Sequence, residues 1–288
     1  MSSPTMRFLL VYKDSTLDHR YRREGERQRY LDAAHDPVFS PLVSGHHAHR
    51  QAMARIEAVL RTLPVEVDRV LRGQAFADEP YDLVLAAGGD GTLLDAAAYV
   101  HRRPLLGVNT SPGTSVGHFC CCTAEELEPY LRDFSGGRVV VREYYRLRVI
   151  LNGVPLERLV LNDVLYAHNH PAGMTSFTLE RGGVTSQFKS SGMWIATAAG
   201  STAGIRSAGG QELEAGSGSF EYLVREPYQG TAATMGILHT DERLHLLNRT
   251  FDTSLFIDGT RCTVPLEFGD RVEVGLTWER LRIVRKGP

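Results

Sequence analysis

The chain lacks a long hydrophobic run, an excess of positive charge and a pattern of paired cysteines over its 288 residues. Near the N-terminus the apolar run from Phe8 to Tyr12 is too short for the core of a signal sequence, and no stretch approaches the roughly 20 apolar residues that span a bilayer. Lys and Arg total 32 against 34 Asp and Glu, so the net charge is -2. The chain therefore lacks the excess of positive charge that is typical of nucleic-acid-binding proteins. We therefore expect a soluble protein with neither a membrane nor a nucleic acid as partner.

Four cysteines are too few, and too closely grouped, for a disulfide framework. Three are contiguous, Cys120 to Cys122, and have no zinc-ligand spacing, which favours a reducing compartment and predicts a cytoplasmic protein. The histidine pairs His46-His47 and His168/His170 lack a third ligand at metal-binding spacing, so we predict no metal held by protein ligands alone. The two tryptophans, Trp194 and Trp278, are predicted to be core aromatics.

What is present is an ordinary globular composition, with 42% hydrophobic residues, and a length that suggests two domains. Short apolar strands alternate with helical periodicity over about the first 140 residues, which predicts an α/β domain with a parallel sheet. The predicted strands are 7–12, 65–70, 83–87 and 105–108, and the predicted helices are 46–63, 92–101 and 124–134. Between them, residues 14–44 show weak periodicity and are predicted to be a partly mobile excursion.

From Val139 onward the pattern changes to short β-rich runs separated by Gly, Asn and Pro, which predicts a predominantly β second domain. We place the boundary at Ser135-Gly136-Gly137, because two glycines follow a helical pattern there. The expected domains are 1–137 and 138–274, with 275–288 as a candidate to complete the first.

The strongest chemical signal is Gly88-Gly89-Asp90-Gly91-Thr92, which lies between a predicted buried strand and a predicted helix. Three glycines permit a sharp turn and a close approach to a ligand, and the amides at a helix N-terminus bind phosphate. Asp90 is suited to accept a proton from an attacking hydroxyl or to position Mg²⁺. A tight turn with a capping Asp explains the same residues. The chain lacks both the Gly-x4-Gly-Lys-Ser/Thr loop and the Gly-x-Gly-x-x-Gly fingerprint of other nucleotide-binding proteins.

A strand followed by Gly-Gly-Asp-Gly-Thr is similar to the superfamily that joins NAD kinases with diacylglycerol and sphingosine kinases. Further blocks follow in the order of the NAD kinase family: Gly107-Val108-Asn109-Thr110, Asn162-Asp163, Lys189-Ser190-Ser191-Gly192, Thr197 to Ala203, Ser207 to Gly210, and Phe256-Ile257-Asp258-Gly259. Together they cover most of residues 83–274. The chain thus resembles an NAD kinase of the branch that includes animal mitochondrial NAD kinase and plant NADH kinase.

The resemblance implies transfer of the ATP γ-phosphoryl to the adenosine ribose 2′-hydroxyl of NAD or NADH, with Mg²⁺ accompanying ATP and the protein forming a homodimer or larger homo-oligomer. Asp90 is the implied catalytic residue. The implied ATP and phosphate ligands are Gly88, Gly89, Gly91, Thr92 and Asn109. The implied dinucleotide ligands are Asn162, Asp163, Ser191, Thr197, Ser201, Thr202, Ala203 and Ser207.

The sequence departs from the family pattern at several of these positions. Asp163 stands where Glu is usual, Ser191 where Asp is usual, and Gly204 where most members have a Tyr that packs near the adenine. Ala198 or Ala199 stands in place of a Pro. The alternatives are a dinucleotide-binding sensor without catalysis and a lipid or small-molecule kinase of the same superfamily. The preference between NAD and NADH, and between ATP and polyphosphate, stays open.

Overall fold

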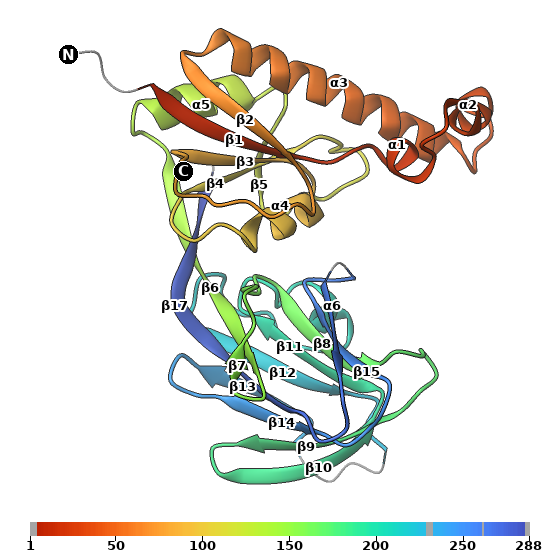
Figure 1. Ribbon diagram of the computed structural model, residues 1–288, viewed down its shortest axis with the longest axis vertical. Helices are drawn as coiled ribbons and strands as arrows, with labels where there is room; N and C mark the ends of the chain where they lie inside the picture. Colours follow the sequence, from red (N-terminus) through yellow and green to blue (C-terminus); the bar gives the residue numbers. More distant parts are fainter. Residues whose placement is uncertain (1–4, 229–232, 261, 286–288) are drawn as a thin grey trace. The chain divides into compact units, whose positions relative to one another are not determined.

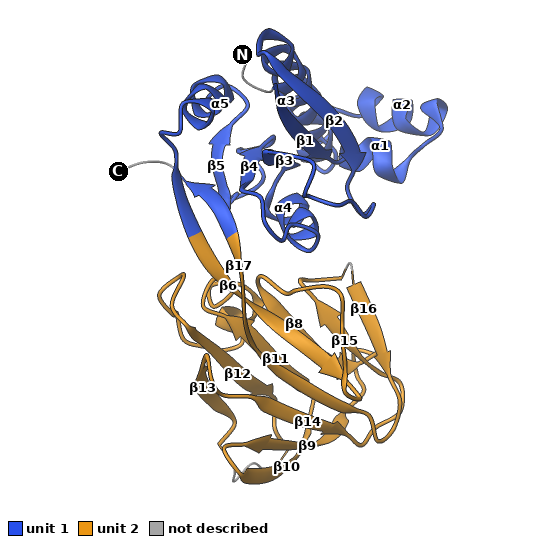
Figure 2. Ribbon diagram, turned by 60° about the vertical axis from the view of Figure 1, so that its left-hand side comes forward, with its two compact units in different colours: residues 1–142, 282–288 blue, residues 143–281 orange. Residues whose placement is uncertain are grey.

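The computed structural model describes residues 5–228, 233–260 and 262–285, and the chain divides into two compact units (Figure 2). Unit 1 comprises Met1–Arg142 and Arg282–Pro288, and unit 2 comprises Glu143–Leu281. Each unit has its own cluster of buried hydrophobic side chains. The α/β N-terminal part and the mostly β C-terminal part confirm the predicted fold class.

Unit 1 is built on a parallel sheet in the order β2-β1-β3-β4 (Figure 1). β5 and the last part of β17 (Arg271–Arg285) both pair with β4, again in parallel. Buried parallel strands require apolar residues on both faces, and all six residues of β3 are buried. The strands are β1 (Met6–Tyr12), β2 (Val65–Leu71), β3 (Leu83–Gly88), β4 (Leu105–Asn109) and β5 (Cys120–Thr123).

Helices cover both faces of this sheet (Figures 1 and 2). α3 (Ser40–Thr62) and α5 share a core with alternate residues of the strands, and α4 lies on the opposite face. The strand residues in this core include Phe8, Leu10 and Leu85. α4 runs over Asp90–Ala97 and α5 over Leu127–Ser135, so the predicted helices 92–101 and 124–134 are confirmed with shifted ends. α4 begins two residues earlier than predicted because Gly89 already serves as its N-cap.

Residues 14–44, where the weak periodicity predicted no particular element, form helices. The segment forms α1 (Thr16–Arg20), α2 (Glu24–Asp32) and the start of α3 (Ser40–Thr62). Local chemistry explains the helices: the Ser15 hydroxyl caps α1 by accepting from the Asp18 N–H, and Pro41 lies in the first turn of α3, where its missing N–H costs nothing. α2 has no buried residue, which is why its hydrophobic periodicity is absent.

Unit 2 consists of two antiparallel layers packed on a shared core (Figure 1). One sheet has the order β13-β12-β11-β8-β15-β16, and the other layer contains β10-β9-β14-β17 with the β6–β7 hairpin at β17. Alternate residues of β8, such as Val164 and Tyr166, point into the core. The order along the chain is β6 (Val140–Leu151), β7 (Val154–Pro155), β8 (Asp163–His168), β9 (Thr175–Arg181), β10 (Val184–Ser190), β11 (Gly192–Thr197), α6 (Gly204–Ser207), β12 (Ser219–Arg225), β13 (Met235–His239), β14 (Leu244–Asn248), β15 (Thr253–Ile257), β16 (Cys262–Leu266) and β17 (Arg271–Arg285).

The two tryptophans both lie in unit 2, and one of them contradicts the prediction. The Trp278 side chain is 73% exposed, with an edge-on contact to the Tyr145 ring, so it is not a core residue. Trp194 is half-buried and packs on the outer face of the β11 sheet against Ala196, Ile205 and Leu223. Trp278 lies in a part of β17 where apolar and polar residues alternate. That pattern does not show whether the face that carries Trp278 is covered by other elements or exposed to solvent.

Candidate active site

The glycine loop is the point where β3 turns into α4. Gly88 ends β3, Gly89 is the N-cap of α4, and the Thr92 N–H donates to the Gly89 carbonyl at 2.9 Å. A Cβ on Gly88 would lie 2.1 Å from the Thr92 Oγ1 atom, so the turn admits no side chain there. The Thr92 hydroxyl is buried and has no hydrogen-bond partner among the residues that the structure describes. The loop therefore combines close backbone packing with the amide-rich start of a helix.

Asp90 lies in the first turn of α4, where the helix dipole favours a negative charge. Its carboxylate accepts two backbone N–H groups, from His118 to Oδ2 and from Phe119 to Oδ1, each at 2.8 Å. These contacts fix the orientation of the carboxylate against the loop before β5. Each oxygen retains a second lone pair, so the partly exposed carboxylate can still accept a proton or bind a cation.

Asn109 holds the loop that follows β4. Its Nδ2 atom donates to the Ser115 carbonyl at 3.0 Å, and its Oδ1 atom accepts from the Ser111 N–H at 3.0 Å. Gly117, at φ +63°, packs directly against the Asn109 side chain. A Cβ at position 117 would lie only 2.4 Å from the Asn109 Nδ2 atom. The same loop brings Ser115 against Gly89. The side chain of Asn109 is thus a brace for the glycine loop, with its remaining hydrogen-bonding capacity limited to one amide hydrogen and one lone pair.

A second group of predicted residues gathers in unit 2 at the start of β8. The Asp163 side chain is 5% exposed, and the Asn162 Oδ1 atom is buried without a hydrogen-bond partner among the described residues. Asp258 was not predicted as a site residue, yet its carboxylate accepts the backbone N–H groups of Leu161, Asn162 and Asp163 at 2.8 to 3.2 Å. The available signal in the sequence was the Asp258-Gly259 pair directly after an apolar run; in the structure the pair follows β15, and Asp258 has φ +48°.

The two carboxyl groups of this group are both buried away from water. Burial raises the pKa of Asp163 to about 7, and the nearby Asp258 charge acts in the same direction. Burial also raises the pKa of Asp258 to about 6, although the backbone donors Asn162 and Leu161 oppose the rise. Asp163 can therefore be either a donor or an acceptor near neutral pH.

The loop from Thr197 to Ala203 lies beside these residues. The Thr197 hydroxyl donates to the Leu161 carbonyl at 2.5 Å, and a Cβ on Gly200 would stand 2.1 Å from the Asn162 carbonyl oxygen. The Ser201 hydroxyl donates to the Ala198 carbonyl at 2.8 Å. Thr197 and Ser201 are fully buried, so their hydroxyls shape the loop from within. The side chains of Thr202 and Ser207 are exposed and Ala203 is half-buried, which leaves these three accessible to a ligand.

The structure separates Ser191 from the other predicted dinucleotide residues. Ser191 precedes β11 and Thr197 ends it, so the six-residue strand, at about 3.3 Å per residue, lies between them. Ser191 lines a pocket of about 360 Å³ together with Trp194 and Phe256. Gly204, in contrast, abuts the tryptophan directly, because a Cβ there would lie 2.9 Å from the indole Cη2 atom. The half-buried indole thus occupies the space beside the residue where the family usually has a Tyr.

Comparison with known proteins identifies the family. The family model for the ATP-NAD kinase N-terminal domain matches residues 9–139. A probable NADH kinase of Oryza sativa subsp. japonica is 31% identical over 281 residues, covering 88% of this chain and 86% of that protein. The chain belongs to the NAD kinase family. An NADH kinase of Arabidopsis thaliana is also 31% identical, covering 82% of this chain and 83% of that protein. The predicted family is thereby confirmed.

Solved structures of NAD kinases share the fold. An NAD kinase from Archaeoglobus fulgidus, in complex with ATP, superposes with a TM-score of 0.69 at 21% identity, covering 97% of this chain and 94% of that chain. The mitochondrial NAD kinase 2 of Mus musculus is 34% identical over 151 residues, which cover 46% of this chain and 33% of that protein. The agreement in structure extends over both units, whereas the mitochondrial relative aligns with about half of the chain.

Proposed function

We propose that the protein is an NAD(H) kinase, which transfers the γ-phosphoryl of ATP to the 2′-hydroxyl of the adenosine ribose of NAD or NADH. The observation that carries this proposal is the Asp90 carboxylate, oriented by two backbone N–H groups in a glycine loop of an NAD kinase family chain. Several relatives are named NADH kinase or NAD kinase, which supports both redox forms as acceptors.

In unit 1, the chemistry rests on positioning and charge stabilisation. The amides of Gly89, Gly91 and Thr92 at the start of α4 would bind donor phosphate, with Gly88 permitting the close approach. Asp90 would accept the proton of the attacking hydroxyl through a free lone pair of its carboxylate. Asn109 would act mainly by holding the adjoining loop, as its two bonds to that loop support.

In unit 2, Asn162 and Asp163 would hydrogen-bond hydroxyl groups of the dinucleotide. The unpartnered Asn162 Oδ1 atom supports this role, because a buried acceptor without a donor carries a free-energy penalty that a ligand hydroxyl would relieve. The accessible Thr202, Ala203 and Ser207 would contact the dinucleotide from the neighbouring loop, whose shape depends on Thr197 and Ser201. Ser191 lies at the other end of β11 and would contact the ligand only through the pocket that it lines.

Magnesium would accompany ATP in this reaction. Mg²⁺ in kinases is held by phosphate oxygens, waters and one or two carboxylates, which fits the single loop carboxylate of Asp90. Among the described residues no three His, Cys, Asp or Glu side chains are grouped so that they could hold a metal without substrate. When bound, the ion would neutralise charge that develops on the donor phosphates.

The deciding experiment compares wild type with Asp90→Asn, and uses Asp133→Asn, a half-buried Asp of α5 that pairs with Arg138, as a control. NADP(H) formation is measured with Mg-ATP and either NAD or NADH, together with dinucleotide binding by calorimetry. We expect Asp90→Asn to lose at least about a hundredfold in kcat, the effect of removing a general base, while it binds the dinucleotide normally. Full activity in Asp90→Asn would refute the catalytic role. Dinucleotide binding by wild type without any product would select the sensor alternative.

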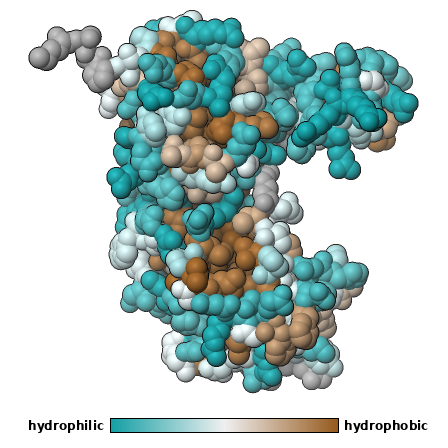
Figure 3. Space-filling view, in the orientation of Figure 1, coloured by the Kyte–Doolittle hydropathy of each residue, from teal (hydrophilic) through white to brown (hydrophobic). Residues whose placement is uncertain are grey.

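We also propose a homodimer or larger homo-oligomer in the cytoplasm. Unit 2 exposes a continuous hydrophobic area on the face shown in Figure 3, and its exposed aromatic side chains include Phe251 at 66% and Phe268 at 54%. The free thiols of Cys120, Cys121, Cys122 and Cys262 fit a reducing compartment. No helix in the described part of the chain is long and apolar enough to cross a membrane. Sedimentation equilibrium of the purified protein tests the assembly, and a monomer mass would contradict it.

A further inference from the structure

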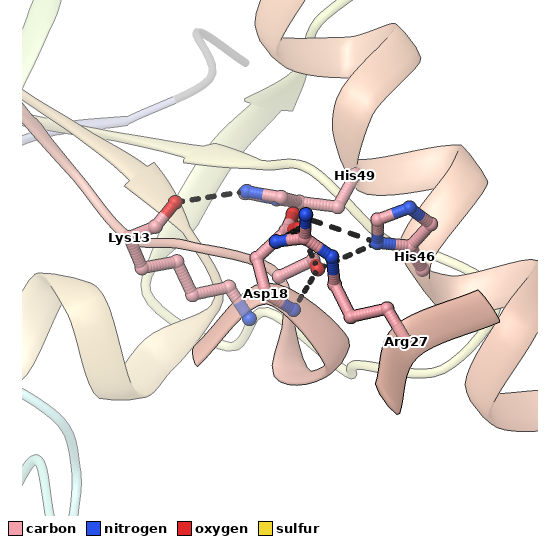
Figure 4. Close-up of polar contacts among 6 residues, drawn as sticks. Lys13, Asp18, Arg27, His46 and His49 are labelled. Carbon is pink, nitrogen blue, oxygen red and sulfur yellow. Dashed lines mark hydrogen bonds and ion pairs between the residues drawn. The ribbon is translucent and has the colours of Figure 1, made fainter. Parts of the chain in front are cut away.

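Two buried histidines of α3, one turn apart, lie outside the residues assigned above to binding and proton transfer (Figure 4). The His46 side chain is 6% exposed and that of His49 is 4% exposed. A buried imidazole needs a partner for each ring nitrogen that can hydrogen-bond, so its contacts reveal what it holds together.

His46 belongs to a network that ties α1 to α3. Its Nδ1 atom lies 2.7 Å from the Ser15 Oγ atom and 3.6 Å from the Asp18 Oδ2 atom, and Arg27 pairs with the other Asp18 oxygen (Figure 4). Ser, His and Asp here do not form a hydrolytic triad, because the hydroxyl and the carboxylate both approach the same ring nitrogen. Ser15 is also 2% exposed and caps α1. The network is therefore structural and fixes the chain that leaves β1.

His49 makes two hydrogen bonds to two different strand ends. Its Nε2 atom lies 2.9 Å from the Lys13 carbonyl oxygen, and its Nδ1 atom lies 2.9 Å from the Thr110 Oγ1 atom. A carbonyl can only accept, so Nε2 carries the ring hydrogen and donates it to Lys13. In the neutral ring Nδ1 then has a lone pair, which accepts the Thr110 hydroxyl hydrogen.

The two bonds of His49 join the ends of the two strands that flank β3. β1 and β4 are the two neighbours of β3, Lys13 directly follows β1, and Thr110 directly follows β4. The imidazole therefore connects the strand ends on either side of the point where β3 turns into the glycine loop. Thr110 is also bonded to that loop, because its N–H donates to the Gly88 carbonyl at 2.8 Å.

We propose that His49 is a positioning residue of the donor site, a crossbar from Lys13 to Thr110 that holds the glycine loop in its phosphate-binding geometry. The proposal rests on the proposed kinase function. It assigns to His49 no contact with substrate. Its effect passes through Thr110 to Gly88, and through the adjoining Asn109 brace to the loop that orients Asp90.

The crossbar depends on the protonation state of the ring. Protonation of the ring would place a hydrogen on Nδ1, which would then donate to the Thr110 hydroxyl instead of accepting from it. The hydroxyl hydrogen of Thr110 would have to point to another acceptor. Burial lowers the pKa of His49, a direction opposed by its bond to the Lys13 carbonyl. The charged groups facing it are Lys13 and Asp14 after β1 and Asp18 on α1, with Lys13 lowering the pKa and both carboxylates raising it. His46 is the titratable neighbour on α3.

The test uses three variants and a matched control on the same helix. Thr110→Val removes the hydroxyl but keeps the shape and the N–H bond to Gly88. His49→Leu removes both ring bonds, and His49→Gln supplies an amide donor and acceptor that do not titrate. His47→Ala, at an exposed position of α3, is the control. For each we would measure kcat and KM for Mg-ATP from pH 5.5 to 8.5, NAD(H) binding, AMP-PNP binding with Mg²⁺, and the melting temperature.

We expect Thr110→Val and His49→Leu each to lower kcat/KM for ATP roughly tenfold, about the value of one buried hydrogen bond, and to leave NAD(H) binding unchanged. A further variant that combines His49→Leu with Thr110→Val should be no worse than His49→Leu alone, because His49→Leu already lacks the bond to Thr110. Because burial lowers the pKa of His49, wild type should keep its kcat/KM for ATP at pH 6.5, about the ordinary histidine pKa, and lose it only at lower pH, and His49→Gln should lack this fall.

Wild-type kcat/KM for ATP in both Thr110→Val and His49→Leu would overturn the proposal. So would additive losses, or equal losses of ATP and NAD(H) binding, since those would indicate general destabilisation. If wild type forms no NADP(H), the proposed kinase function is wrong. The positioning role of His49 is then tested separately by AMP-PNP binding. Weaker AMP-PNP binding in both Thr110→Val and His49→Leu, with binding by the His47→Ala control equal to wild type, would support it, and binding equal to wild type in every variant would refute it.

Discussion

At the residue scale, the burial of the Asp163 and Asp258 carboxyls carries a cost in stability next to Asn162, a residue that we propose binds the dinucleotide. The backbone N–H groups of Leu161, Asn162 and Asp163 all donate to Asp258. Burial and the neighbouring Asp258 charge both oppose ionisation of Asp163 and raise its pKa. A purely structural residue at this position would be better replaced by a neutral one. The retained acid is consistent with a role in hydroxyl binding.

The linkage between these pKa values and stability has a definite sign. Both values lie above the ordinary Asp value of about 3.9, at about 7 for Asp163 and about 6 for Asp258. The folded protein therefore binds more protons than the unfolded chain between these limits. Their contribution to stability is complete below about pH 4 and is lost as the pH rises through 6 to 7.

We predict that Asp163→Asn flattens the dependence of stability on pH. In wild type these groups should lower the melting temperature between pH 5 and pH 8, because each tenfold difference in proton affinity between the folded and unfolded states corresponds to about 1.4 kcal/mol. The variant removes one titrating group and its repulsion of Asp258, so its melting temperature should fall by several degrees less over that range. Differential scanning fluorimetry measures this, with the exposed Asp241→Asn of the same unit as control. The idea fails if Asp163→Asn and wild type show the same slope.

At the element scale, the junction of β3 and α4 is fixed by backbone packing. Position 88 must be glycine because the Thr92 side chain occupies the space of its Cβ. The residues that follow, Leu93 and Ala96, are buried and anchor α4 on the sheet, so the helix cannot move away without losing core contacts. The loop is therefore rigid because both of the elements that it joins are held.

We predict that Gly88→Ala disrupts this junction. Its Cβ would stand 2.1 Å from the Thr92 Oγ1 atom and 2.6 Å from the Thr92 Cβ atom, so α4 or Thr92 must shift. Overpacking of this kind costs about 1 to 3 kcal/mol, and a displaced loop should reduce kcat/KM for ATP by about a hundredfold. Gly113→Ala is the control, since a Cβ there meets nothing within 4 Å. Kinetics and urea unfolding of both variants would show it, and equal behaviour of the two would contradict the packing argument.

At the scale of the whole molecule, unit 1 is completed by residues from the far end of the chain. Ile283 pairs with Leu105 of β4, and Val284 belongs to the core formed by β1, β3 and α3. Both side chains are fully buried. Unit 1 therefore cannot reach its final packing until β17 has been synthesised, and its stability depends on residues that follow all of unit 2.

We predict that Val284→Ala destabilises the protein by about 2 kcal/mol, because it removes two buried methyl groups and leaves a cavity beside β4. Val116→Ala, at a side chain that is 92% exposed, should be neutral. Urea unfolding followed by circular dichroism compares them. A lower free energy of unfolding in Val284→Ala but not in Val116→Ala supports the completion of unit 1 by β17. Equal stability of both variants would argue against it.

Sequence alone was sufficient for the family, the fold class and the glycine loop, because each depends on local chemistry. An apolar strand, three glycines and an Asp before a helix reveal the loop without any long-range information, and the order of the later blocks identifies the family. The same local patterns failed for α2, which has no buried face, and for Trp278, whose exposure depends on which strands pair with β17.

The tertiary structure decided what the side chains are free to do. It engaged Asn109 and Ser201 in bonds within their own loops and bonded Thr197 to the Leu161 carbonyl. It left Thr202 and Ser207 accessible, and placed Ser191 at the opposite end of β11. It also brought Asp258 to Asp163 and His49 to Thr110 across 95 and 61 positions of sequence. Hydrogen bonding and burial act between groups that the fold makes neighbours, and a linear pattern carries no record of such neighbours until the strands are paired.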